Sequence, residues 1–208
     1  MSRRDTPRLQ QRDPAFALRA RWYRTPLARA LRRVRRRRAA ETYVVSFPKA
    51  GRTWRRVLLS EALTRHFGVA ASPDFKLWRL AEQHPELTPI RFSHDENPHW
   101  KTPAQLVARK TEFRDCRVIL LVRDFRDLVV SAYFQASRRS GVYDGDLASF
   151  VHSPAGSIAT MVRFYNHWAA NRDVPRDFML LRYEELHADP AAELRRVLDF
   201  LGVSGVAP

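Results

Sequence analysis

After residue 41, short apolar runs alternate with longer segments in which apolar residues recur every three or four positions. The runs are rich in β-branched and aromatic residues, which predicts buried strands. We expect these strands at 43–47, 89–95, 116–124 and 177–183. The segments with helical spacing predict helices at 53–67, 102–113, 125–139, 157–172 and 189–202.

This alternation predicts an α/β fold in three layers, α/β/α, around a central parallel sheet. Strands that are separated by helices pair in parallel through right-handed crossovers, and the helices cover both faces of the sheet. Ligands of such sheets bind beyond the carboxyl ends of the strands. A functional site is therefore expected in the loops that follow residues 47, 95 and 123.

Composition favours a single domain. The 208 residues are 45% apolar, which is enough to bury a core, and they contain one cysteine, Cys116. One cysteine excludes an intramolecular disulfide and argues against a cysteine-based zinc site. No run of about 18 apolar residues is present, so no membrane-spanning helix is expected.

Charge divides the chain into two predicted parts, an arginine-rich arm at 1–40 and a domain at 41–208. The arm holds 14 arginines and two acidic residues, a net charge of 14 − 2 = +12. The whole chain has a net charge of +15, so residues 41–208 carry only +3 and are nearly balanced. Residues 14–40 carry a loose apolar stripe, which fits a helix on an anionic membrane surface or a solvated helix packed on the body. Nucleic acid is a less expected partner of the arm. No apolar stretch typical of a secretory signal is present, so we expect a cytoplasmic protein, peripheral to a membrane if the arm binds one.

The loop FPKAGRTW, at 47–54, follows the first predicted strand. Backbone N–H groups of a tight turn at Gly51 and of the helix start, with the Lys49 ammonium and the Thr53 hydroxyl, could cradle an anion. The alternative is an ordinary turn with a solvated lysine. A Walker A loop is excluded, because its lysine directly follows the second glycine, whereas Lys49 precedes Gly51.

Three blocks resemble the sulfotransferases that use 3′-phosphoadenosine 5′-phosphosulfate (PAPS). FPKAGRTW resembles their 5′-phosphosulfate loop, and LVRDFRDLVVSAYF (121–134) resembles their 3′-phosphate block. LLRYEELHADPAAELRRVLDFLGV (180–203) resembles their late strand-to-helix segment. The resemblance covers about residues 41–203 and implies a P-loop-like domain that uses PAPS, releases adenosine 3′,5′-bisphosphate (PAP) and needs no metal.

The resemblance also implies roles for individual residues. Lys49 would contact the phosphosulfate bridge and stabilise the charge of the leaving group. The remainder of the loop would hold the 5′-phosphate, with the indole near the adenine: Ala50, Gly51, Arg52, Thr53 and Trp54.

Arg123 and Ser131 would bind the 3′-phosphate, and Tyr183 would approach the adenine. A guanidinium fork suits a phosphate dianion. From the residues alone, Arg123 could instead pair with Asp124 or Asp127, and Tyr183 could lie at the edge of the core.

The acceptor needs a general base, and the family commonly uses a histidine after the second strand. His94 has that position, and His99 in the same loop is its rival. Asp95 and Glu96 could orient His94 or raise its pKa. Arg91 and Lys101 could add positive charge beside the transferring sulfuryl group.

Two features depart from the family pattern. Arg52 stands where the family usually has a small hydroxyl residue, and no Arg-Lys-Gly loop follows GVSGVAP. The leading prediction is a sulfotransferase that acts on a hydroxyl or amine of a small molecule, lipid or glycan. The alternatives are a kinase-like enzyme that uses ATP and Mg²⁺, or a non-catalytic protein whose arm binds anionic membrane or nucleic acid. The sequence predicts no particular oligomeric state.

Overall fold

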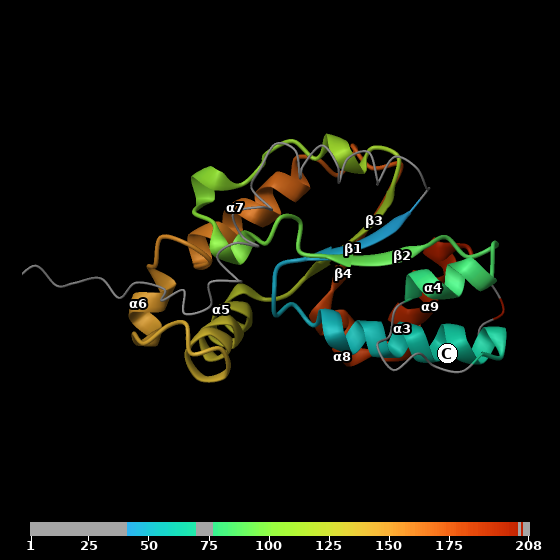
Figure 1. Cartoon of the computed structure of the whole chain (residues 1–208), viewed down its shortest axis with the longest axis horizontal. Helices are drawn as coiled ribbons and strands as arrows, with labels where there is room; N and C mark the ends of the chain where they lie inside the picture. Colours follow the sequence, from blue (N-terminus) through green and yellow to red (C-terminus); the bar gives the residue numbers. More distant parts are fainter. Residues whose placement is uncertain (1–40, 70–76, 204, 206–208) are drawn as a thin grey trace, which may run out of the picture.

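The computed structural model describes residues 41–69, 77–203 and 205, and these residues form a four-stranded parallel sheet with helices on both faces (Figure 1). The strand order is β2-β1-β3-β4, and every neighbouring pair is parallel. The strands are β1 (Thr42–Ser46), β2 (Ile90–Ser93), β3 (Arg117–Val122) and β4 (Asp177–Arg182). The predicted three-layer α/β fold is therefore confirmed.

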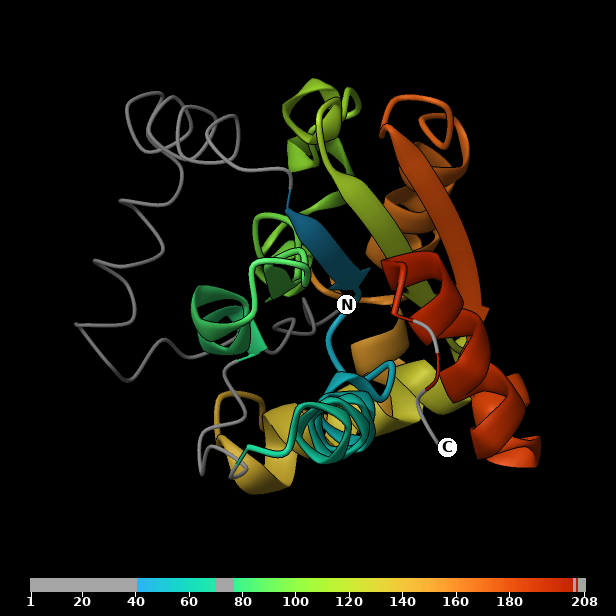
Figure 2. The ribbon, with the colours of Figure 1, turned by 90° about the vertical axis from the view of Figure 1, so that its right-hand side faces the viewer.

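Side chains of the central strands alternate between two apolar clusters, because successive residues of a strand point to opposite faces. Tyr43 and Val45 join the cluster formed with α5 (Phe125–Phe134), α6 (Leu147–Val151) and α7 (Ile158–Ala169). Val44 joins the opposite cluster, formed with α3 (Arg52–Phe67), α4 (Leu77–Gln83) and α9 (Pro190–Leu201). Figure 2 shows β1, β3 and β4 side by side at the centre of the molecule.

The predicted helix at 102–113 is wrong. Thr102 and Gln105 form a capping box, but the helical turn that they start ends at Gln105, and two further 3-10 turns lie at Pro98–Trp100 and Thr111–Phe113. Leu106 packs against the core, and the buried Lys110 ammonium donates to the carbonyl of Val107. The Lys110 ammonium also pairs with Asp95, which precedes this segment. Packing and ion pairing thus accompany the open path of the segment, and local helical spacing does not decide its structure.

The predicted helix at 125–139 divides into two parts. The α-helix α5 ends at Phe134, and a π-helical turn follows at Gln135–Arg139. Such π turns are rare and are frequent at functional sites. The other predicted strands and helices are found with ends shifted by a few residues, and α4, α6 and α8 (Tyr183–Ala188) lie in segments without a predicted element.

The predicted basic arm at 1–40 lies outside the described residues, so its helix and its separation from the domain stay predictions. Within the ranges that the structure describes, no helix is both long enough and apolar enough to cross a membrane.

Candidate active site

The loop between β1 and α3 is anchored in the core and strained where it meets the solvent. Phe47 and Ala50 are fully buried, which fixes the path of the backbone. Lys49 and Gly51 have φ angles of 76° and 90°, in the left-handed region. That region is unfavourable for a lysine, and strain of this kind gathers at functional sites. The loop therefore presents Lys49 from a backbone that the core holds in place.

Tyr183, the first residue of α8, packs directly under this loop. A Cβ atom built on Gly51 would lie 2.5 Å from Cδ2 of the Tyr183 ring, so no side chain fits there. The Arg123 guanidinium lies 4.4 Å from the centre of the same ring, and the Trp54 ring lies 6.4 Å from it. Tyr183 thus brings together the first and second predicted phosphate-binding blocks. Its predicted contact with an adenine stays a prediction.

Replacing Gly51 with alanine is expected to lower the free energy of unfolding by about 2 kcal/mol or more, because backbone strain and overpacking against Tyr183 each cost roughly 1–3 kcal/mol. Gly68 is a matched control, since its φ is 64° and a Cβ atom there would meet nothing within 4 Å. Gly68→Ala should therefore show the backbone cost alone. Urea denaturation measures both variants, and equal losses would contradict the role assigned to the Tyr183 contact.

A cavity of about 330 Å³ opens beside the loop, between Lys49 and one face of α5. Its lining contains three cations and one carboxylate: Lys49, Arg123, Arg139 and Asp127. Partial burial and the positive charges of Arg139 and Arg123 lower the pKa of Lys49. Cations that repel one another in a shared cavity are stabilised by a bound anion, so the cavity is suited to a phosphorylated ligand.

Hydrogen bonds hold the cationic side chains at this cavity. The Lys49 ammonium donates to Oε1 of Gln135 over 3.2 Å. Arg123 donates from Nη1 to the Lys49 carbonyl over 3.2 Å, and its Nη2 lies 3.6 Å from Oδ2 of Asp127. Ser131 completes the lining between them. The structure therefore brings together Lys49, Arg123 and Ser131, three residues that the sequence assigns to donor binding.

The remaining predicted donor residues lie at the start of α3 rather than in the cavity lining. Ala50 is buried, whereas Thr53 and Trp54 are exposed, Trp54 at 39%. The first turn of α3 has no side-chain cap and no acidic residue. Its free backbone N–H groups and the helix dipole favour an anion at this end.

Two polar residues of the cavity lining were missed from the sequence, Gln135 and Arg139. Asp127, Ser131, Gln135 and Arg139 are spaced by four residues, and this spacing places them on one helical face. The four-residue spacing of these polar residues could have been recognised in the sequence, whereas the π turn that contains Gln135 and Arg139 could not.

His94 lies one residue beyond β2, and its ring is oriented by the backbone of β1. Its Nδ1 lies 2.9 Å from the carbonyl oxygen of Ser46. Because a carbonyl can only accept, Nδ1 carries the hydrogen, which leaves Nε2 unprotonated and able to take a proton. Burial and the positive charges of Arg52 and Arg56 lower the pKa of His94 to about 4, so the ring is neutral near pH 7.

His99, the rival base, lies beside His94, with the two ring centres 6.2 Å apart. Burial, with the nearby His94 and Arg52, lowers the pKa of His99 to about 3. Its Nδ1 is buried without a hydrogen-bond partner. Only His94 has a ring orientation fixed by a backbone hydrogen bond, which keeps it the better candidate for the base.

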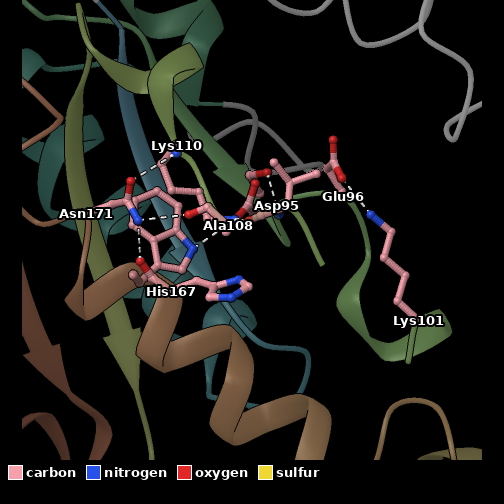
Figure 3. A network of polar contacts seen from close by, with 10 residues as sticks. Asp95, Glu96, Lys101, Ala108, Lys110, His167 and Asn171 are labelled. Atoms are coloured by element: carbon pink, nitrogen blue, oxygen red, sulfur yellow. Dashed lines mark hydrogen bonds and ion pairs between the residues drawn. The ribbon is translucent and has the colours of Figure 1, made fainter. Parts of the chain in front are cut away.

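Asp95 and Glu96 do not assist His94, contrary to expectation. The Asp95 carboxylate accepts from Nε1 of Trp168 over 3.0 Å and lies 2.6 Å from the Lys110 ammonium (Figure 3). Glu96 accepts from the Lys101 ammonium over 2.6 Å. These contacts engage both carboxylates with partners other than His94, and they hold the loop that carries it.

Arg91 and Lys101 also differ from expectation, because both are held in ion pairs. Arg91 donates to Glu41, just before β1, over 2.6 Å, which places its charge near the opposite end of the sheet from His94. Lys101 is neutralised by Glu96. Neither Arg91 nor Lys101 is therefore placed to act on the transferring sulfuryl group.

Removing the charge of Asp95 is expected to destabilise the fold strongly. Both partners of the Asp95–Lys110 pair are buried, with side chains 1% and 4% exposed. Asp95→Asn leaves the Lys110 cation without a countercharge, and breaking a buried pair typically costs about 3–5 kcal/mol. Chemical denaturation measures the loss.

A matched control is Asp173→Asn, whose pair with Arg172 is exposed and spans 3.8 Å. Its cost should stay below about 1 kcal/mol. Lys110→Met in the Asp95→Asn background should recover part of the loss, because it removes the unpaired cation. A similar cost for the Asp95 and Asp173 variants would refute this account.

The two half-buried histidines make the fold sensitive to acid. A histidine in the unfolded chain has a pKa near 6.5, whereas burial lowers the pKa of His94 to about 4 and that of His99 to about 3. Below about pH 6.5 the unfolded chain therefore binds more protons, and the free energy of unfolding falls as the pH drops toward 4. Each unit of difference corresponds to about 1.4 kcal/mol, so we expect a loss of several kcal/mol.

Urea denaturation at a series of pH values measures this loss. The double variant His94→Gln/His99→Gln lacks both groups and should show a clearly smaller slope between about pH 6.5 and 5. An unchanged slope in the double variant would show that other groups cause the acid sensitivity.

Comparison with known proteins identifies relatives of the chain. The family model described as "Sulfotransferase domain" matches residues 40–206. Cytosolic sulfotransferase 1 of Arabidopsis thaliana is 23% identical over 183 residues, which cover 76% of this chain and 55% of that protein. Flavonol 3-sulfotransferase of Flaveria bidentis is 22% identical over 184 residues, which cover 78% of this chain and 56% of that protein. The chain thus spans a little over half the length of these relatives.

A solved structure supports the fold. Retinol dehydratase, crystallised with androsterone and the inactive cofactor PAP, superimposes with a TM-score of 0.52 at 14% identity, over 79% of this chain and 60% of that one. At this identity the likeness concerns the fold. The family match covers all four strands, the cationic cavity and His94, and on this basis the chain belongs to the sulfotransferase domain family.

Proposed function

We propose that the chain transfers a sulfuryl group from PAPS to a hydroxyl or amine acceptor. The observation that carries this proposal is the cavity in which Lys49, Arg123 and Arg139 converge beside Ser131. A donor with both 3′- and 5′-phosphates needs two anion sites. The cavity would bind the 3′-phosphate, and the free backbone N–H groups at the uncapped start of α3, residues 51–54, would bind the 5′-phosphate.

The proposed reaction is an in-line displacement at sulfur. The acceptor oxygen forms a bond to sulfur while the bond between sulfur and the phosphate oxygen breaks, and PAP leaves. His94 takes the acceptor proton at Nε2, since Nδ1 is occupied by the Ser46 carbonyl. Lys49 stabilises the negative charge that develops on the leaving oxygen. The strained backbone at Lys49 and the fixed ring of His94 supply the positioning on which such transfers depend.

The acceptor class and the location of the protein are part of the proposal. A relative is named for its action on flavonols, which supports a small-molecule acceptor, with lipids and glycans as further candidates. Relatives named as cytosolic support a cytoplasmic location. Binding of residues 14–40 to an anionic membrane stays a prediction from charge alone.

Thermal stabilisation by PAP tests the donor site, with AMP and ATP as comparators. Ligand at about 100 times its dissociation constant adds roughly 2.7 kcal/mol to the free energy of unfolding. PAP should shift the melting temperature far more than AMP does, because only PAP carries the 3′-phosphate that Arg123 and Ser131 would bind. Arg123→Ala should abolish the difference between PAP and AMP.

The same measurement separates the alternatives. An ATP shift equal to that of PAP, with dependence on Mg²⁺, would favour the kinase-like reading. If none of the three nucleotides stabilises the protein, the donor site is refuted and a binding role for residues 1–40 becomes the better hypothesis.

A further inference from the structure

Two arginines of α3 lie beside the proposed base. Arg52 and Arg56 are separated by one helical turn and therefore lie on the same face of α3. The Arg56 guanidinium lies 5.0 Å from the centre of the Phe92 ring, and Phe92 precedes His94 by two residues on β2. Arg52 is close enough to both His94 and His99 to lower the pKa of each. This places the two guanidinium groups at the acceptor side of the site.

These arginines form a cationic group separate from the donor cavity. The cations that act on Lys49 are Arg139 and Arg123, whereas those that act on His94 are Arg52 and Arg56. Neither Arg52 nor Arg56 lines the 330 Å³ cavity. The site therefore has one group of positive charge for the donor phosphates and a second group beside the base.

Among the residues that the structure describes, no carboxylate forms an ion pair with the second group, Arg52 and Arg56. Nε of Arg56 and Nδ1 of His99 are both buried without a hydrogen-bond partner. Partly buried cations and buried polar atoms without a partner are costly unless a ligand satisfies them. An anionic group with several acceptor oxygens would do so.

Building on the proposed sulfotransferase function, we infer that the acceptor carries a carboxylate, sulfate or phosphate close to the hydroxyl or amine that is sulfated, and that Arg52 and Arg56 bind this anion. Phe92 and Arg56 would contact the part of the acceptor that joins the anion to the reacting group. The small hydroxyl residue usual at position 52 in the family could not provide this charge. Arg52 would thus be a specificity residue that distinguishes anionic from neutral acceptors.

Matched acceptors that differ only in charge test this inference. With PAPS as donor, the wild-type protein should show at least a tenfold higher kcat/KM for 2-hydroxyphenylacetate than for 2-hydroxyphenylacetamide, as expected when charge-assisted hydrogen bonds replace neutral ones. Arg52→Thr and Arg56→Gln should each reduce this ratio, and the double variant should bring it within about threefold of one. The ratio is informative even if a variant also changes the overall rate.

A second readout needs no turnover. Phenylacetate and phenylacetamide are titrated into the PAP-saturated protein, and binding is followed by the imidazole NMR signals of His94 and His99. The carboxylate should bind at least tenfold more tightly than the amide and should raise the pKa of His94, because it offsets the neighbouring cations. Arg65→Gln is the control, since Arg65 is exposed, pairs with Glu61 over 2.7 Å and lies at the far end of α3.

Three results would overturn the inference: equal binding of the two ligands by the wild-type protein, a charge preference that survives both substitutions, or a loss of PAP affinity in Arg52→Thr with an unchanged ratio. The last result would assign Arg52 to the donor. The titration repeated without PAP separates this inference from the proposed function. A charge preference in a protein that fails to bind PAP would refute the donor site and leave the anion site standing.

Discussion

Replacing Lys49 with methionine is expected to lower kcat by roughly 10²–10³-fold, the usual cost of removing one positioned group that stabilises charge in the transition state. Lys49 lies in the cationic cavity on a backbone of positive φ, held by the buried Phe47 and Ala50 on either side. Methionine keeps the length of the side chain and removes its charge. PAP formation from PAPS, with any acceptor that the wild-type protein sulfates, measures the loss.

Arg138→Gln is the matched control for Lys49→Met. It removes one positive charge from the neighbouring π turn, but Arg138 stacks on Phe134 at 4.6 Å and does not line the cavity. Its kcat should remain within about threefold of the wild type. A Lys49→Met variant with a raised KM and an unchanged kcat would instead show that Lys49 binds ground state and transition state equally.

Replacing His94 with glutamine is expected to reduce kcat by roughly 10²–10⁴-fold, the range for loss of a positioned general base. The reason is the fixed tautomer: Nδ1 donates to the Ser46 carbonyl, so Nε2 is the proton acceptor. Since the pKa of His94 is lowered to about 4, the base stays neutral and active down to about pH 5. In the wild type, kcat/KM should therefore be flat on the acid side of neutrality and fall only as the pH approaches 4.

His99→Gln distinguishes the two histidines. His99 lies next to His94 and is equally buried from solvent, but no backbone carbonyl fixes its ring. Its replacement should cost much less in kcat than that of His94. A larger loss for His99→Gln would transfer the role of base to His99.

The parts of the fold that were predicted correctly depend on local patterns. Four apolar runs became the four strands, and the two central ones, β1 and β3, are buried on both faces of the parallel sheet. FPKAGRTW and the block around Arg123 and Ser131 were placed together for the same reason: each directly follows a strand of the predicted sheet, at its carboxyl end.

The errors concern side chains whose partners lie far away in the sequence. Asp95 is adjacent to His94 in the sequence, yet its carboxylate pairs with the Lys110 ammonium and accepts a hydrogen bond from Trp168. Such choices depend on which buried charge meets which partner, and hydrophobic spacing carries no information about that.

The close packing of Tyr183 against Gly51 could not be predicted from the sequence either. The sequence marks Gly51 as a turn glycine, but only the packed structure shows that a ring from a segment more than a hundred residues away excludes any Cβ atom there. Arg139 was missed because a π turn carries it into the cavity.

The position of β2 has a consequence for how such a protein can diversify. β2 is an edge strand whose only neighbour among the described strands is β1, while the donor cavity is built around the ends of β1 and β3 inside the sheet. Mutations, insertions or exchanges in the segment after β2 can therefore reshape the acceptor side while the inner strands and the donor cavity remain intact. Inheritance of one cosubstrate and rapid drift toward new acceptors would follow from this separation.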